Sequence, residues 1–482
     1  MILLTLLGLP LFAAAVLACV GDRKLAPEIN IAGSAATFIA GFWLAWEVYL
    51  QGPMLAGGKF FFVDAFNVYL AVLTSFVSMT TAIFSRRYMR REREHGRVGH
   101  WGMRFYHAMF QLFIFAMLLC LLTNNVGVLW IAMELATLST VLLVSLYRTP
   151  SAIEAAWKYF ILCGVGIAQA LFGTVLLYFA AEKVLGEGGE ALLWTNLSQV
   201  SGKLEPTVLS LAFVFLMVGY GTKVGLVPVH NWLPDAHSEG PTPISAVLSG
   251  LLLNVALYAL VRCKVLVDGS TGTHHAGDIM MGFGLLSILV ASFSLLRQKD
   301  IKRMFAYSSI EHMGIATFAF GLGGPLATFG ALLHMLMHSL TKSSIFFTVG
   351  HASQMHWTQE MDKIKGLIKG NPLVGWGLML GVMAIVGMPP FGVFTSEFFI
   401  LTATIKDAPL LTPFLLLGLG VAFAALFKRV QPMVGGDTPP YQKSIKVAHI
   451  PVVLHMALVL VIGVYMPDFL NQWFKTAVEL LK

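Results

Sequence analysis

The stretch Gly219-Tyr-Gly-Thr-Lys223-Val-Gly-Leu-Val-Pro228 interrupts an apolar run that is otherwise long enough to cross a membrane. Glycine and proline weaken a helix and leave backbone groups without partners. Lipid cannot satisfy such groups, so a break persists only where protein or water surrounds it. A second break, Gly387-Met-Pro-Pro-Phe-Gly392, follows five predicted helices later. Each break lies beside an ionisable residue, Lys223 in the first and Glu397 after the second.

The composition is that of a membrane protein. Of the 482 residues, 57% are hydrophobic and 12% are charged, whereas soluble chains carry about 25% charged residues. A soluble enzyme is therefore excluded. Because a spanning helix needs about 20 apolar residues, we expect an all-α polytopic protein of about 14 transmembrane helices, with helices 7 and 12 broken. The expected helices cover residues 2–20, 29–50, 66–84, 105–123, 125–147, 155–181, 207–232, 242–263, 276–296, 302–322, 325–350, 372–402, 409–430 and 446–466.

The spacing of the two breaks predicts an internal repeat. Broken helices in matching positions are typical of transporters built from inverted repeats. We therefore expect two inverted five-helix repeats, formed by helices 4–8 and 9–13; the alternative is two unrelated proline kinks. The expected parts are an N-terminal three-helix segment with a basic cytoplasmic loop (1–104), the first repeat (105–267), the second repeat (268–440), and a last helix with a short amphipathic tail (441–482).

The basic residues predict the orientation. Most of the 32 Lys and Arg residues fall in every second loop, and such loops face the cytoplasm. Both termini are then expected on the outer side. The third loop is the strongest marker, and we favour an orientation signal over a ligand-binding role for it. Its basic residues are Arg86, Arg87, Arg90, Arg91, Arg93, Arg97 and Arg104.

No cofactor motif is present in the sequence. The four cysteines are far apart and form no CxxC pair, which argues against a zinc or iron–sulfur site. There is also no P-loop or glycine-rich dinucleotide motif. We therefore expect no redox cofactor, metal or nucleotide, and we attribute the net charge of +7 to membrane topology rather than to nucleic acid binding.

A short set of ionisable residues inside the predicted helices forms the candidate site. A charged group at the centre of a membrane costs about 3 kcal/mol on insertion scales, so such groups usually mark paths of ions or protons. Glu311 also lies in a helix but is expected to project away from its neighbour His312. The candidates for a proton relay are Glu134, Lys223, His230, His312, His334, His338, Lys342 and Glu397.

The spacing of His334, His338 and Lys342 places them on one face of a helix. Histidine titrates near neutrality, so a row of histidines can pass protons through water; the alternative is polar contacts that only hold helices together. Glu397 is the expected terminal acceptor, open to the outside, or else a charge that stabilises the start of its half-helix. His312 is either a bridge between the halves or a core histidine, and His230 is a candidate for the input. Asp235, His237 and Glu239 are more typical of a solvated loop than of a proton entrance.

Several long strings resemble the antiporter-like membrane subunits of complex I and membrane-bound hydrogenases. The strings that resemble the family's glutamate helix, lysine helix and helix 10 are Leu129-Trp-Ile-Ala-Met-Glu134, Thr222-Lys-Val-Gly-Leu-Val-Pro-Val-His-Asn-Trp-Leu-Pro-Asp-Ala-His237, and Asp300-Ile-Lys-Arg-Met-Phe-Ala-Tyr-Ser-Ser309 with Glu311-His-Met-Gly314. Those that are most like hydrogenase-4 component F are Gly250-Leu-Leu-Leu-Asn254, His338-Ser-Leu-Thr-Lys342 and Met388-Pro-Pro-Phe-Gly-Val-Phe-Thr-Ser-Glu397-Phe.

The resemblance implies a proton-translocating, non-redox subunit of a complex I-like or formate hydrogenlyase-type hydrogenase complex. Its partners would be other membrane subunits in a prokaryotic inner membrane, and redox chemistry in those partners would drive H⁺ transport. Glu134 and Lys223 would form the central pair. Asn254 stands where relatives commonly carry a lysine or histidine, which puts a continuous lysine wire in question. The alternatives are a subunit of a multisubunit Na⁺/H⁺ antiporter, an inactive scaffold, or a carrier that works alone.

Overall fold

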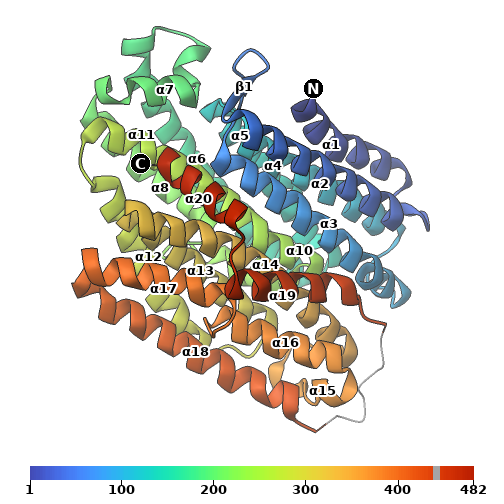
Figure 1. Ribbon diagram of the computed structural model, residues 1–482. Helices are drawn as coiled ribbons and strands as arrows, with labels where there is room; N and C mark the ends of the chain where they lie inside the picture. Colours follow the sequence, from blue (N-terminus) through green and yellow to red (C-terminus); the bar gives the residue numbers. More distant parts are fainter. Residues whose placement is uncertain (438–445, 482) are drawn as a thin grey trace.

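The computed structural model describes residues 1–437 and 446–481 (Figure 1). Within these residues the chain is a bundle of helices with a single antiparallel hairpin, formed by β1 (Met54–Ala56) and β2 (Phe61–Val63). The expected all-α membrane fold is confirmed. Helices α1 and α2 lie on the opposite side of the bundle from α17 and α18 in Figure 1.

The helices of the N-terminal half are α1 (Ile2–Val20), α2 (Ala26–Gln51), α3 (Ala65–Glu94), α4 (His100–Leu122), α5 (Val126–Val144), α6 (Pro150–Leu185), α7 (Trp194–Val200), α8 (Pro206–Val224) and α9 (Trp232–Glu239). They are followed by α10 (Thr242–Val247), α11 (Leu253–Thr271), α12 (His275–Leu295), α13 (Ile301–Leu322), α14 (Gly324–His356), α15 (Leu367–Gly370), α16 (Pro372–Ile385), α17 (Gly392–Asp407), α18 (Thr412–Gly435), α19 (His449–Val464) and α20 (Asp468–Leu480). Short turns are η1 (Ser145–Tyr147), η2 (Gly189–Leu192), η3 (Ser201–Lys203), η4 (Leu248–Leu252), η5 (Met361–Lys363) and η6 (Pro409–Leu411).

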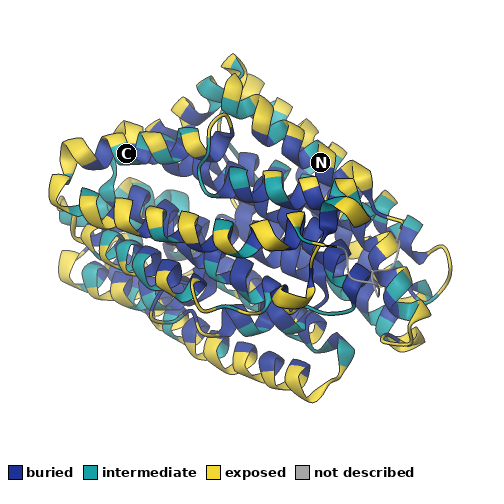
Figure 2. Cartoon of the chain, turned by 90° about the horizontal axis from the view of Figure 1, so that it is seen from below, coloured by how far each residue is buried: buried dark blue, intermediate teal, exposed yellow. Residues whose placement is uncertain are grey.

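Ten helices in the described residues are long and apolar enough to cross a membrane, or eleven if the bent pair α19–α20 forms one span. Exposed residues lie along the outer faces of the bundle and buried residues fill its interior (Figure 2). Every expected helix coincides with a helix or a broken helix pair. The count of fourteen spans and the two inverted repeats remain predictions.

The first break lies where the sequence predicts it, although the helix ends earlier than expected. Helix α8 stops at Val224 rather than at residue 232, because Gly225 takes a left-handed conformation with φ of +82°. The Trp232 indole donates a hydrogen bond to the Thr222 carbonyl over 2.8 Å. The break thus replaces a lost helical partner with a side chain, as buried backbone groups require.

The second break separates α16 from α17. Helix α16 ends at Ile385, Gly387 has a positive φ of +71°, and α17 begins at Gly392. The expected boundary between residues 440 and 441 lies outside the described residues. The expected amphipathic tail forms α20, whose Trp473 indole donates to the Ala65 carbonyl over 2.7 Å.

A third irregular element was not foreseen. The predicted helix over 242–263 consists of α10, the π-helical segment η4 and α11. A π-helical turn shifts the side chains that follow it and is frequent at functional sites. Here it directly precedes Asn254, which is the second residue of α11.

Candidate functional site

The first cluster, which we call the Lys223 group, comprises Glu134, Thr137, Tyr159 and Lys223 from α5, α6 and α8. Lys223 is completely buried, and its Nζ lies 4.0 Å from Oε2 of Glu134, whose side chain is 23% exposed. The Lys223 ammonium also donates to the Thr137 hydroxyl and lies 5.9 Å from the centre of the Tyr159 ring. Lys223 is the penultimate residue of α8, so the break that ends this helix fixes the position of the lysine.

Aromatic packing holds Tyr159, the ring that forms one wall of the Lys223 group. The Tyr159 ring stacks on Trp232 with centroids 4.4 Å apart, and the Tyr159 hydroxyl is 2.8 Å from the Thr140 hydroxyl. Trp232 is the same residue that satisfies the freed carbonyl of Thr222. The residues after the break therefore hold both the end of α8 and the wall around its lysine.

The second cluster, which we call the Lys342 group, gathers buried ionisable residues from α13, α14 and α17. Lys342 is buried and donates to the Phe305 carbonyl over 3.0 Å. It also interacts electrostatically with Glu311. The group comprises Glu311, His312, His334, His338, Lys342 and Glu397.

The histidines of the Lys342 group contact one another. His312 Nδ1 lies 3.1 Å from His334 Nε2, and His334 Nδ1 lies 2.9 Å from the Ser396 hydroxyl. The His338 ring centre is 5.7 Å from that of His312, and neither His338 nitrogen has a hydrogen-bond partner among the described residues. The row on α14 thus joins α13 through His312 and α17 through Ser396.

Glu397 lies deeper than its expected place at the outside. Its side chain is 11% exposed, and its Oε1 lies 4.0 Å from His312 Nδ1. Because α17 begins at Gly392 and has no acidic residue in its first turn, the alternative role as a helix-start charge is weak. The carboxylate instead folds back onto Gly387, where a Cβ would meet it directly.

The two remaining candidates lie between the groups or at their edge. Asn254 donates to the Met335 carbonyl over 3.0 Å and to the Ser339 hydroxyl over 2.7 Å, which ties α11 to α14. Its Oδ1 is buried without a hydrogen-bond partner among the described residues. His230 follows the first break and faces Tyr307, with ring centres 6.3 Å apart.

Two buried ionisable residues were not among the candidates from the sequence. Glu311 was expected to project away from its neighbour His312, and it is buried on α13, which packs against α14. Lys302 was not singled out from the sequence, yet its buried Nζ donates to the carbonyls of Ser238 and Gly240. The sequence position of Glu311 could have identified it as a candidate, because an acidic residue ten positions into an apolar helix is costly to bury in a membrane.

The region of Asp235, His237 and Glu239 is a helix rather than a solvated loop. These residues belong to α9, and His237 is buried against the Phe346 ring at 5.2 Å. Asp235 pairs with Arg303 at 2.8 Å and with Lys158 at 3.3 Å. The segment after the first break is therefore packed into the protein by ion pairs and an aromatic contact.

One group in the described residues has the geometry of a metal site. Ligand atoms of His312, His334 and Glu397 lie within 4.8 Å of one another, and histidine and glutamate are ordinary zinc ligands. The His334 nitrogens also lie within hydrogen-bonding distance of His312 and Ser396. These contacts account for the arrangement as a hydrogen-bonded chain without a metal.

The fold and the two clusters together define a class. Broken helices with buried lysine, histidine and glutamate residues are typical of polytopic membrane proteins that move ions. The family described as "NADH:quinone oxidoreductase/Mrp antiporter, TM" matches residues 123–422. The chain belongs to this family of antiporter-like membrane subunits.

Individual relatives are similar over the whole chain. A curated relative, the hydrogenase-4 component F homolog of Methylacidiphilum infernorum (isolate V4), is 46% identical over 98% of both chains. A chain of the archaeal membrane-bound sulfane sulfur reductase complex is 25% identical, with a TM-score of 0.90 over 100% of this chain and 98% of that one. A chain of the Mrp complex from Dietzia sp. DQ12-45-1b has the same fold, with a TM-score of 0.87 at 17% identity over 100% of this chain and 97% of that one. The resemblance inferred from the sequence is confirmed.

Proposed function

We propose that the chain translocates protons as a non-redox subunit of a complex I-like or formate hydrogenlyase-type hydrogenase complex. The observation that carries the proposal is the buried Lys223, whose Nζ lies 4.0 Å from Oε2 of Glu134; a second buried lysine, Lys342, belongs to a group that also contains Glu311 and three histidines. A buried lysine releases its proton easily when its carboxylate is neutralised or withdrawn. Redox chemistry in partner subunits supplies the energy.

The magnitudes are sufficient for uphill transport. Two unit charges 4 Å apart interact by about 4 kcal/mol at an effective dielectric constant of about 20. Moving one charge against 100 mV costs about 2.3 kcal/mol. Breaking and restoring the Lys223–Glu134 pair therefore exchanges enough energy to drive one proton against a typical membrane potential.

The relay runs from the Lys223 group to the Lys342 group and then to Glu397. Asn254 does not titrate, so protons pass this region through water. In support, several buried polar atoms on α11, α13 and α14 have no hydrogen-bond partner among the described residues, and internal water usually satisfies such atoms. They are Asn254 Oδ1, Ser308 Oγ, Thr341 Oγ1 and Ser343 Oγ. His334 and His338 then carry protons along α14.

Purification of the native complex and reconstitution into vesicles test the proposal. We expect hydrogenase or quinone-reductase subunits to co-purify, and we expect electron transfer to acidify one side of the vesicle membrane. Electron transfer with no pH change, even though the chain is present in stoichiometric amount, would contradict proton translocation by this chain.

The second candidate is a subunit of a multisubunit Na⁺/H⁺ antiporter. The fold shared with a chain of the Mrp complex favours it. Vesicles distinguish the two functions, because an antiporter subunit would exchange Na⁺ for H⁺ without an electron donor. Co-purification with cation-antiporter subunits alone would also favour this second candidate.

A further inference from the structure

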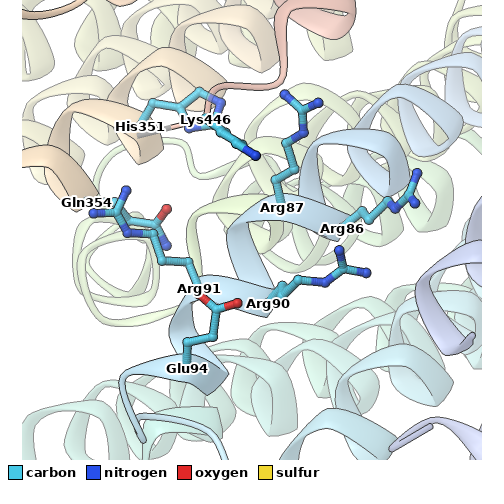
Figure 3. A pocket seen from close by; sticks show the side chains of 8 residues that line it. All are labelled: Arg86, Arg87, Arg90, Arg91, Glu94, His351, Gln354 and Lys446. Atoms are coloured by element: carbon cyan, nitrogen blue, oxygen red, sulfur yellow. The ribbon is translucent and has the colours of Figure 1, made fainter. Parts of the chain in front are cut away.

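A basic pocket of about 480 Å³ opens where the end of α3 meets the end of α14 (Figure 3). Three chain segments form it: the last turns of α3, the last turns of α14, and the segment before α19. Its lining residues are Arg86, Arg87, Arg90, Arg91, Glu94, His351, Gln354 and Lys446. The sequence predicted that these arginines lie in the third loop, and there we interpreted them only as a signal that orients the chain in the membrane.

The positive charge of the pocket is only partly compensated. Arg86 pairs with Glu28 at 2.8 Å, and Arg90 lies 3.8 Å from the same carboxylate. In the described part of the chain, no carboxylate forms an ion pair with Arg87, Arg91 or Lys446. Such an excess of cations at one hollow attracts an anion.

The pocket also holds an unused buried donor. His351 Nε2 accepts a hydrogen bond from the backbone N–H of Ala448 over 3.0 Å, so its proton resides on Nδ1. Nδ1 is buried and has no hydrogen-bond partner among the described residues. The planar guanidinium of an arginine can donate two parallel hydrogen bonds to the oxygens of a phosphate. The chemistry of the lining is that of a phosphate site.

The surroundings of the pocket favour an amphiphile over a free ion or an acidic peptide. On α19, directly after Lys446, Ile450 is 68% exposed and Val453 is 52% exposed. Leu25, at the start of α2 near Glu28, is 67% exposed. Apolar residues on the outer faces of a membrane protein contact acyl chains, and basic pockets between membrane helices bind anionic headgroups.

We propose that this pocket binds the phosphate headgroup of an anionic phospholipid, whose acyl chains lie along the exposed face of α19. The bound lipid joins the end of α3 to the end of α14, the helix that carries His334, His338 and Lys342. The proposed lipid site is independent of the proposed proton transport, because lipid binding can be measured in the absence of transport.

The test compares lipid retention by two matched double variants of the full-length chain in its complex. Arg91→Gln with Lys446→Gln removes two pocket charges. Arg23→Gln with Lys24→Gln removes the same two residue types at exposed positions outside the pocket. The complexes are stripped of lipid, incubated with phosphatidylglycerol or phosphatidylcholine, and examined by native mass spectrometry.

We expect the wild type and the Arg23/Lys24 variant to retain phosphatidylglycerol at least about tenfold better than phosphatidylcholine, and the Arg91/Lys446 variant to lose this preference. Equal retention by both double variants would overturn the proposal. Binding of inorganic phosphate in the pocket without any preference between the two lipids would assign it to a free anion instead. A photo-crosslinking amino acid in place of Glu94 should label lipid; labelling of a partner subunit would overturn the proposal in favour of a protein contact.

Discussion

The Lys223 group and the Lys342 group both accommodate a buried lysine, but the residues around the two lysines differ. Each buries a lysine beside a carboxylate. Lys223 stands at the end of a broken helix with one partly exposed glutamate and an aromatic wall. Lys342 lies inside the continuous helix α14, among three histidines and two glutamates. The difference teaches that the first group has the composition expected of a switch, because it contains one ion pair, whereas the second has the composition expected of a conducting path, because it contains several titratable groups.

The largest effect is expected for Lys223→Met, because it removes the only lysine of the switch. Transport should fall by about 100-fold or more, since a coupling of about 4 kcal/mol is lost, while the complex still assembles. The measurement is pH-gradient formation in vesicles, with Lys183→Met at an exposed position as the control. Normal pumping by Lys223→Met would remove this residue from the mechanism.

Lys342→Arg tests whether the second group conducts protons or only balances charge. Arginine keeps the positive charge but does not release its proton at accessible pH. We expect a loss of about tenfold or more, close to that of Lys342→Met. Wild-type pumping by the arginine variant would make Lys342 a static charge, and the contrast between the two groups would disappear.

Glu311→Gln tests whether the two groups share one lysine–carboxylate design. Removal of one partner leaves a buried charge without its counter-ion. We expect transport to fall by roughly tenfold, comparable to Glu134→Gln, because both changes leave a lysine unpaired. The same vesicle assay measures both variants, and an unaffected Glu311→Gln variant would show that Lys342 does not use this carboxylate.

The histidine row should respond as one unit. His334→Ala and His338→Ala should each slow transport by roughly threefold. The double variant should slow transport by clearly less than the product of the two single effects, because either single change already interrupts the same proton path. Single and double variants are compared in one double-mutant cycle. Multiplicative effects would mean that the two histidines act on separate paths.

The smallest expected effect concerns packing at the second break. A methyl group at Gly387 would meet the Glu397 carboxylate and would also strain a positive φ. We expect Gly387→Ala to destabilise the complex by roughly 1–3 kcal/mol and to slow transport through the displaced carboxylate. Gly420→Ala in α18 is the control, since nothing lies within 4 Å of its Cβ position. Equal melting temperatures for both variants would show that Glu397 does not need this close approach.

The sequence predicted the elements well because they depend on local patterns. Apolar runs predicted the long helices but not the short helices α7, α9 and α15, and the glycine and proline clusters predicted both breaks. The spacing of His334, His338 and Lys342 predicted a shared face, since it depends only on the helical period. Glu311 was misjudged because helical geometry describes one helix at a time, and its partner Lys342 lies on the next one.

The sequence by itself determined that the chain is a helical membrane protein, where its helices break, and which buried residues can carry charge. These properties follow from the cost of polar groups in lipid, which acts on each segment separately. Only the tertiary structure decided which groups meet: Lys223 with Glu134, and His312 with His334 and Glu397. It also showed that arginines predicted to lie in the third loop line a pocket at the end of α3. The physical reason is that these contacts join residues far apart in the chain, and their distances depend on how whole helices pack.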